Sequence, residues 1–106
     1  MSNFADANTQ AQFAAEKMQK NNLFTTERLF CDVYCFEAGQ AQTGHAHAGS
    51  DKVYYVIDGR ARIRIGVEER EVGAGTAALA PSGVMHAIAN PGPERLRVLV
   101  LMAPKP

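Results

Sequence analysis

Apolar and polar residues alternate along much of the chain from residue 28 onward, and this alternation predicts β-strands. In residues 60–65, arginines alternate with alanine and isoleucine, which is typical of a strand with one face in solvent. Residues 52–57 read KVYYVI and are apolar on both faces, which favours a strand buried between two layers. Further strands are expected at residues 28–37, 70–72, 76–80, 84–89 and 95–102.

Turn residues separate these segments. Asp58-Gly59 is a two-residue hairpin signal, and Gly73-Ala74-Gly75 and Pro81-Ser82-Gly83 interrupt the later strands. Asn90-Pro91-Gly92-Pro93 ends the strand before the last one. Many short strands separated by such turns predict an all-β sandwich or barrel.

The first 24 residues differ from the rest and form an N-terminal segment. Thr9-Gln10-Ala11-Gln12 matches a weak capping box, and the alanines and Met18 that follow have helical spacing. We therefore expect a short helix near residues 9–19, placed on the edge of the domain or on a partner subunit. Residues 25–106 are expected to form one domain, because a chain of 106 residues is too short for two cores.

Composition narrows the classes of function. The chain has 11 basic and 11 acidic side chains and a net charge of zero, which argues against a nucleic-acid surface or an electrostatic membrane anchor. No apolar run has the ~20 residues of a membrane helix, and the first residues do not resemble a signal peptide. Cys31 and Cys35 lie too far apart on a strand for a disulfide, so we expect reduced thiols and a cytoplasmic protein.

The three histidines are the candidate chemistry. His45 and His47 flank a single residue, so on a strand their rings share a face. His86 can reach the same point only through folding. Imidazole is the commonest metal ligand in proteins, and three of them with a position left open describe a reactive site more than a structural one.

Two spaced motifs contain these histidines. The first has a glycine, five residues, His-x-His and, after a spacer, a second glycine; the second is Gly-x₅-Pro-x-Gly-x₂-His-x₃-Asn. Besides the three histidines, the fixed positions are Gly39, Gly59, Gly75, Pro81, Gly83 and Asn90. The glycines and the proline sit where the chain must reverse, and Asn90 precedes a proline in a turn, so these positions serve the fold.

Together the motifs resemble those of the cupin superfamily, in particular the small single-domain cupins of the cupin 2 conserved barrel type. The resemblance covers about residues 28–102 and implies an antiparallel jelly-roll β-barrel. It implies that His45, His47 and His86 bind a divalent metal inside the barrel. It also implies a homodimer formed by sheet packing or strand exchange.

One position departs from the family pattern. Cupins usually carry a glutamate ligand that is separated by six residues from the closing glycine of the first motif, and here that position is Lys52. An ammonium group cannot ligate, and at 4 Å and an effective dielectric constant of 20 each unit of like charge costs about 4 kcal/mol.

Four outcomes are open. Lys52 loses its proton; it swings away and leaves a three-histidine site; it takes the place of the metal, with neutral histidines and a bound anion around it; or Asp51 replaces the glutamate, which requires a β-bulge. We favour the second. Tyr34, Tyr54 and Gln42 are the other candidate pocket residues. Met85 is expected to face away from the pocket, and the arginines at positions 60, 62 and 64 to be solvated.

The function expected from these features is that of a metal-dependent oxygenase, decarboxylase or isomerase acting on a small organic molecule. Zinc, iron, manganese, nickel and copper all remain candidates, because imidazole suits several of them. The alternative is a non-catalytic barrel that binds a small molecule or an anion, with Lys52 in place of the carboxylate and no metal. A purely structural role would leave three converging imidazoles unexplained.

Overall fold

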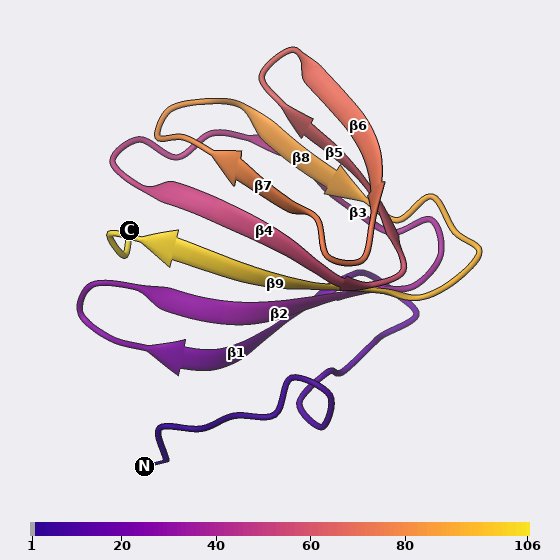
Figure 1. Cartoon of the computed structure of the whole chain (residues 1–106), viewed down its shortest axis with the longest axis horizontal. Helices are drawn as coiled ribbons and strands as arrows, with labels where there is room; N and C mark the ends of the chain where they lie inside the picture. The colour runs from indigo at the N-terminus through magenta and orange to yellow at the C-terminus, as the bar shows by residue number, and fades with distance from the viewer. Residues whose placement is uncertain (1) are drawn as a thin grey trace.

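The computed structural model describes residues 2–106 and consists of nine antiparallel β-strands in two sheets packed face to face (Figure 1). One sheet has the order β1-β2-β9-β4-β7 and the other the order β3-β8-β5-β6. The strands are β1 Gln19–Thr25, β2 Phe30–Phe36, β3 Ala41–His45, β4 Asp51–Asp58, β5 Arg60–Ile65, β6 Glu68–Gly73, β7 Ala77–Ala80, β8 His86–Ala89 and β9 Leu96–Ala103. The predicted all-β jelly-roll barrel is confirmed.

The core lies between the sheets and follows the predicted alternation. In β9, Leu96, Val98 and Val100 point inward and are fully buried, while the residues between them lie on the outer face. The aromatic residues Tyr34, Phe36 and Tyr54 join them from β2 and β4. Burying apolar side chains on one face of each strand drives the two sheets together.

The predicted N-terminal helix is wrong. Within residues 2–106 no helix forms; residues 7–10 make a single turn, in which the Gln10 N–H donates to the Asp6 carbonyl at 3.1 Å. The segment is instead held to the barrel, because the Gln40 side chain donates to the Ala14 carbonyl at 2.7 Å and that of Asn21 to the Gln12 carbonyl at 3.1 Å. An alanine-rich stretch with little apolar surface gains more from these contacts than from an isolated helix.

Two strands were missed by the alternation pattern. β1 crosses the expected boundary at residue 24 and contains a register shift between Asn22 and Phe24, so its polar and apolar residues do not alternate regularly. β3 is short and also contains a register shift, between Gln42 and His45. Bulges of this kind break the period of two on which sequence-based strand prediction rests.

The Asp58-Gly59 turn is not a hairpin. β4 lies in the five-stranded sheet and β5 in the four-stranded sheet, so the chain changes sheets at Gly59. Gly59 has φ +88°, and a Cβ there would lie 2.4 Å from the Arg95 carbonyl oxygen and 2.9 Å from the Leu96 Cα. Glycine is required here both by its backbone conformation and by the close approach of β9.

Replacing Gly59 with alanine is expected to destabilise the barrel more than the same change at Gly75. Both glycines have similar positive φ, but nothing lies within 4 Å of a Cβ at Gly75. The free energy of unfolding of Gly75→Ala should therefore fall by only about 1–2 kcal/mol, the cost of an alanine in the left-handed backbone region. That of Gly59→Ala should fall by about 1–3 kcal/mol more because of the clash. Urea unfolding measures both; equal losses would show that the close approach is relieved at no cost.

Candidate metal centre

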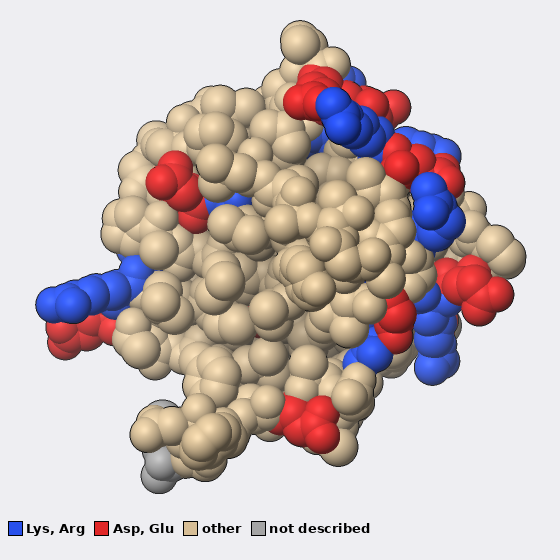
Figure 2. Space-filling model, in the orientation of Figure 1, with Lys and Arg blue, Asp and Glu red and all other residues tan. Residues whose placement is uncertain are grey.

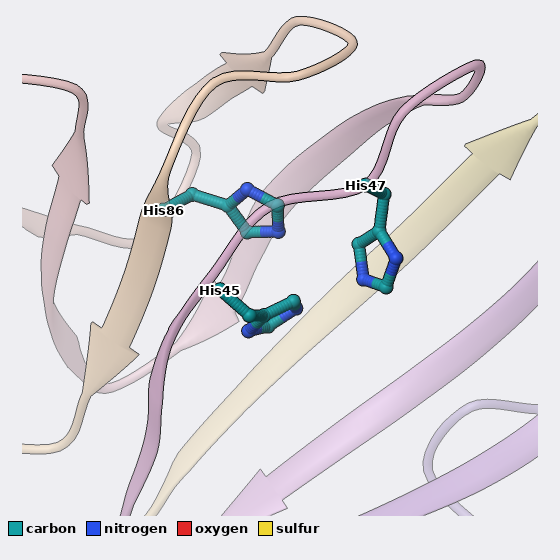
Figure 3. A group of neighbouring side chains, drawn as sticks. All are labelled: His45, His47 and His86. Atoms are coloured by element: carbon teal, nitrogen blue, oxygen red, sulfur yellow. The ribbon is translucent and has the colours of Figure 1, made fainter.

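The three histidines converge at one end of the barrel (Figure 3). His45 ends β3, His86 begins β8 as its register partner, and His47 follows in the loop that leads to β4. One ring nitrogen from each lies within 4.8 Å of the others. Ligands of a single ion at about 2.1 Å span at most ~4.2 Å, so the rings are close to the spacing that a shared ion requires.

The outer nitrogens of two rings are fixed by the backbone. The Nδ1 of His45 lies 2.9 Å from the Thr43 carbonyl oxygen, and the Nδ1 of His86 lies 2.9 Å from that of Val84. A carbonyl only accepts hydrogen bonds, so each Nδ1 carries a proton, and in the neutral ring each Nε2 then presents a lone pair. The Nε2 of His86 is buried and has no hydrogen-bond partner within residues 2–106. This donor set fits a divalent transition metal.

His47 is positioned by the second motif. The Gly83 N–H donates to the His47 carbonyl at 2.7 Å, the Gly49 N–H donates to Ser82 Oγ at 2.7 Å, and the Ser82 N–H donates to Asp51 Oδ1 at 2.9 Å. The turn at residues 81–83 therefore clamps the loop that carries His47. Only two of these five residues, Gly83 and His47, belong to the motifs, so the roles of Ser82, Gly49 and Asp51 were missed.

Asp51 does not replace the missing glutamate. It is exposed on the outer face of β4, and its carboxylate is engaged with Ser82. The pairing of β4 with β9 runs without a shift through Asp51 and Lys52, and the irregularity lies further on, between Val56 and Asp58. The bulge that Asp51 would need is therefore absent.

Burial keeps two of the imidazoles neutral. The pKa of His86 is lowered by burial, against the hydrogen bond to Val84, and the pKa of His47 is lowered by burial and then by the charge of its neighbours His45 and Lys52. Neutral imidazole is the form that binds a metal. Two of the three imidazoles are thus in the ligating form near neutral pH.

Acidification of the metal-free protein from pH 7.5 to 5.5 is expected to lower its stability. The unfolded chain, with histidine pKa values near 6.5, takes up protons that the folded chain resists. The contribution of His47 and His86 is therefore complete above the unfolded pKa near 6.5 and is lost as the pH falls from there through their lower pKa values in the folded protein. Urea unfolding across this range measures how steeply the free energy of unfolding depends on pH, and His86→Gln should make this dependence shallower. A free energy of unfolding that rises on acidification would contradict the lowered pKa values of the two histidines.

Lys52 points into the barrel and is not exposed. Only 2% of its surface is accessible, and its Nζ donates to Gln42 Oε1 at 3.3 Å. The same nitrogen lies 5.1 Å from the Tyr34 ring centroid and 5.2 Å from that of Tyr54, a cation–π arrangement on both sides. Burial lowers the pKa of Lys52 to about 8, helped by Lys20, so the side chain is still mainly an ammonium at neutral pH.

The other expected pocket residues surround this lysine. Tyr34 and Tyr54 are buried on the inner face of their sheet, and burial raises the pKa of both, that of Tyr34 to about 12. The Tyr54 ring centroid lies 6.2 Å from that of His86, and its hydroxyl has no hydrogen-bond partner within residues 2–106. Gln42 is half-buried on β3 and contacts both Lys52 and Tyr34.

The remaining candidates lie outside the centre. Met85 is exposed, and Arg60, Arg62 and Arg64 lie on the outer face of β5. Two of these arginines pair with Glu71 of β6. Both cysteines are free and buried, and burial raises the pKa of each thiol, which disfavours reactivity.

Comparison with known proteins gives one family. A family model described as "Cupin domain" matches residues 32–102. An uncharacterized protein of Streptomyces coelicolor is 39% identical over 82 residues, which cover 76% of each chain. A crystal structure from Thermus thermophilus is 40% identical with a TM-score of 0.95, covering 99% of this chain and 100% of the other. A Klebsiella pneumoniae protein with a double-stranded β-helix domain has a TM-score of 0.91 at 23% identity, covering 98% and 91%, and so shares the fold.

Proposed function

Because the chain belongs to the cupin family, we propose that it is a metal-dependent cupin that binds one divalent ion through His45, His47 and His86 and acts on a small organic molecule. The observation that supports this most strongly is the buried, unpartnered Nε2 of His86, aimed at two other imidazoles. A bound ion would polarise a substrate oxygen or activate dioxygen, the chemistry of an oxygenase, decarboxylase or isomerase. Zinc, iron, manganese, nickel and copper are all compatible with this donor set.

The residues of the chain itself prepare this site. The Thr43 and Val84 carbonyls hold two rings in the ligating tautomer, and the Gly83 amide fixes the backbone of His47. Three protein ligands leave coordination positions open for a substrate. Tyr54 and Lys52 would then contact the bound molecule and exclude water from one side of it.

A binding barrel without turnover is the second candidate. It is favoured by Lys52, which stands at the position of the usual carboxylate ligand and carries a positive charge that opposes metal binding. In this alternative the three neutral imidazoles and the ammonium would enclose a small molecule or an anion.

Titration of the metal-free protein with Mn²⁺, Zn²⁺ and Ni²⁺ by calorimetry separates these two candidates. The metal-dependent hypothesis predicts one ion per chain and a loss of more than about 100-fold in affinity for His86→Ala, since even residues that only support a ligand are worth 10–100-fold. Met85→Ala, next to it but exposed, is the matched control and should bind normally. Equal binding by wild type and His86→Ala would favour the barrel without metal.

We also propose that the protein is a homodimer joined through the outer face of the five-stranded sheet. Tyr55, Leu79 and Leu101 are exposed there on three adjacent strands. Figure 2 shows that this face is largely free of charged side chains, which gather around its rim. A second copy can cover such a face by a two-fold contact that needs no charge complementarity.

Leu79→Arg is expected to shift the protein from dimer to monomer, because the contact would bury an unpaired guanidinium in each copy. Sedimentation equilibrium at micromolar concentration measures the mass. Val67→Arg serves as the control, since Val67 is the most exposed large apolar residue but lies in the β5–β6 turn away from this face. A wild-type monomer would refute the dimer.

A reducing compartment such as the cytoplasm remains our proposal for location. It is supported by two buried cysteines that are free. Residues 2–106 contain no helix with the length and apolar character needed to span a membrane.

A further inference from the structure

Lys52 is a buried cation without an acidic partner. Its one hydrogen bond goes to the neutral amide oxygen of Gln42, and the ion pairs formed within residues 2–106 do not include it. An ammonium group has three donors. A buried charge that is paired with neither a carboxylate nor a full set of acceptors is costly, so a ligand that supplies the missing anion would be bound favourably.

The charged groups that act on Lys52 from the neighbouring strands are Lys20 and Asp32. Lys20 of β1 is exposed, and its Nζ lies 5.6 Å from the Tyr34 ring centroid. Asp32 of β2 is buried; its carboxylate accepts a hydrogen bond from Asn22 at 2.8 Å and forms no ion pair with Lys52. β3 and β8 contribute histidines, and β9 contributes apolar residues. The ammonium group of Lys52 is therefore left without an acid in direct contact, and a divalent ion at the histidines would add positive charge near it.

A cleft beside Lys20 and Gln42 is positively charged, because its lining contains two lysines and no acidic residue. It has a volume of about 520 Å³, lies between the edges of β1 and β3, and its lining includes Lys17, Lys20 and Gln42. Gln42 therefore faces the cleft and also contacts Lys52. Positive charge along a cleft raises the local concentration of anions and speeds their entry.

The unpartnered hydroxyl of Tyr54 supplies a second donor. It is buried near His86, and burial raises its pKa, so the phenol keeps its proton. The Lys52 Nζ lies 5.2 Å from the centroid of this ring. An ammonium group and a phenol O–H so close together can donate to the two oxygens of one carboxylate. Arginine and helix N-termini commonly bind phosphate groups, but β2 and β4 contain no arginine and residues 2–106 contain no helix.

We propose that the ligand of the candidate metal centre is a small organic acid whose carboxylate is held by Lys52 and Tyr54 beside the three histidines. This proposal rests on the proposed function, because the metal ion would hold the part of the acid that Lys52 and Tyr54 do not contact. The contact with the carboxylate depends on Lys52 and can be tested with or without the ion.

Calorimetric titration with lactate, pyruvate and malonate, each compared with its neutral amide at constant ionic strength, tests this proposal. The wild type should bind at least one acid 10-fold or more tightly than the matching amide. Lys52→Met should weaken binding of that acid at least 10-fold and leave the amide unaffected, and Tyr54→Phe should weaken it several-fold. Lys105→Met, at an exposed position, should bind like the wild type. Thermal unfolding of Lys52→Met checks that it folds, as expected for a buried ammonium replaced by an apolar side chain of similar size.

The outcomes separate this proposal from the metal centre. Binding of an acid to metal-free protein, lost in Lys52→Met, would uphold the carboxylate site even if no ion binds to the histidines. If the metal binds but acids are not preferred over amides, or Lys52→Met binds them equally well, the proposal is overturned. Inorganic phosphate that binds as tightly as the best acid, and also depends on Lys52, would overturn the assignment to carboxylates.

Discussion

Lys52→Glu is expected to raise the affinity for a divalent ion by at least about 100-fold. The change removes a buried positive charge that, after burial, helps to lower the pKa of His47 and His86, and it supplies a carboxylate ligand on the inner face of β4. A 100-fold gain corresponds to about 2.7 kcal/mol, which is below the ~4 kcal/mol that a single pair of unit charges at 4 Å gives at an effective dielectric constant of 20. The expected gain therefore allows for relaxation of the side chains around the ion.

Lys52→Met divides this effect into its two causes. Methionine removes the charge without adding a strong ligand, so its metal affinity should lie between those of the wild type and Lys52→Glu. Competition with a chelator of known affinity measures all three proteins under one set of conditions, with Lys105→Glu as the control for a change of charge far from the site. If Lys52→Glu binds no more tightly than the wild type, then the side chain at this position does not reach the metal.

Asn90→Ala is expected to destabilise the protein by about 2–5 kcal/mol. Asn90 is 2% exposed, and its side-chain amide donates to the Phe36 carbonyl at 3.1 Å and to the Glu94 carbonyl at 2.8 Å, while its Oδ1 accepts from the Gly92 N–H at 2.8 Å. Alanine leaves these groups without their partner, and each buried polar group left unpaired costs about 1–3 kcal/mol. The side chain thus joins the end of β2 to the turn between β8 and β9.

Urea unfolding measures this loss, and two variants serve as controls. Asn90→Asp keeps the acceptor for Gly92 but loses both donors, so it should be destabilised by a similar amount. Asn3→Ala, at an exposed position, should be neutral. A loss below about 1 kcal/mol in Asn90→Ala would mean that water replaces the amide in these contacts.

The sequence predicted the parts of the structure that depend on local chemistry. The alternation of β5 and the positive φ angles of the glycines at positions 39, 59, 75 and 83 follow from side-chain periodicity and steric freedom, both of which are visible in the residues themselves. The grouping of the three histidines was also predicted, because it follows from motif spacing in a known kind of barrel.

Features that depend on distant contacts could not be predicted in this way. The Asp58-Gly59 pair has the composition of a hairpin, but the approach of β9 turns it into a change of sheet. The apolar residues on both faces of β4 were expected to be buried, yet Tyr55 is 42% exposed on the uncovered outer face. The position of the Lys52 amine depends on Tyr54 of the same strand and also on Gln42 of β3 and Tyr34 of β2, which its own segment does not reveal.

The metal content of the wild-type protein, purified without an affinity tag and measured by inductively coupled plasma mass spectrometry, tests the central claim most directly. A metal centre formed by His45, His47 and His86 predicts close to one divalent transition metal per chain, and close to none in His86→Ala prepared in parallel. Wild-type protein that carries no metal, and acquires none on exposure to Mn²⁺, Zn²⁺, Ni²⁺ or Fe²⁺, would contradict it.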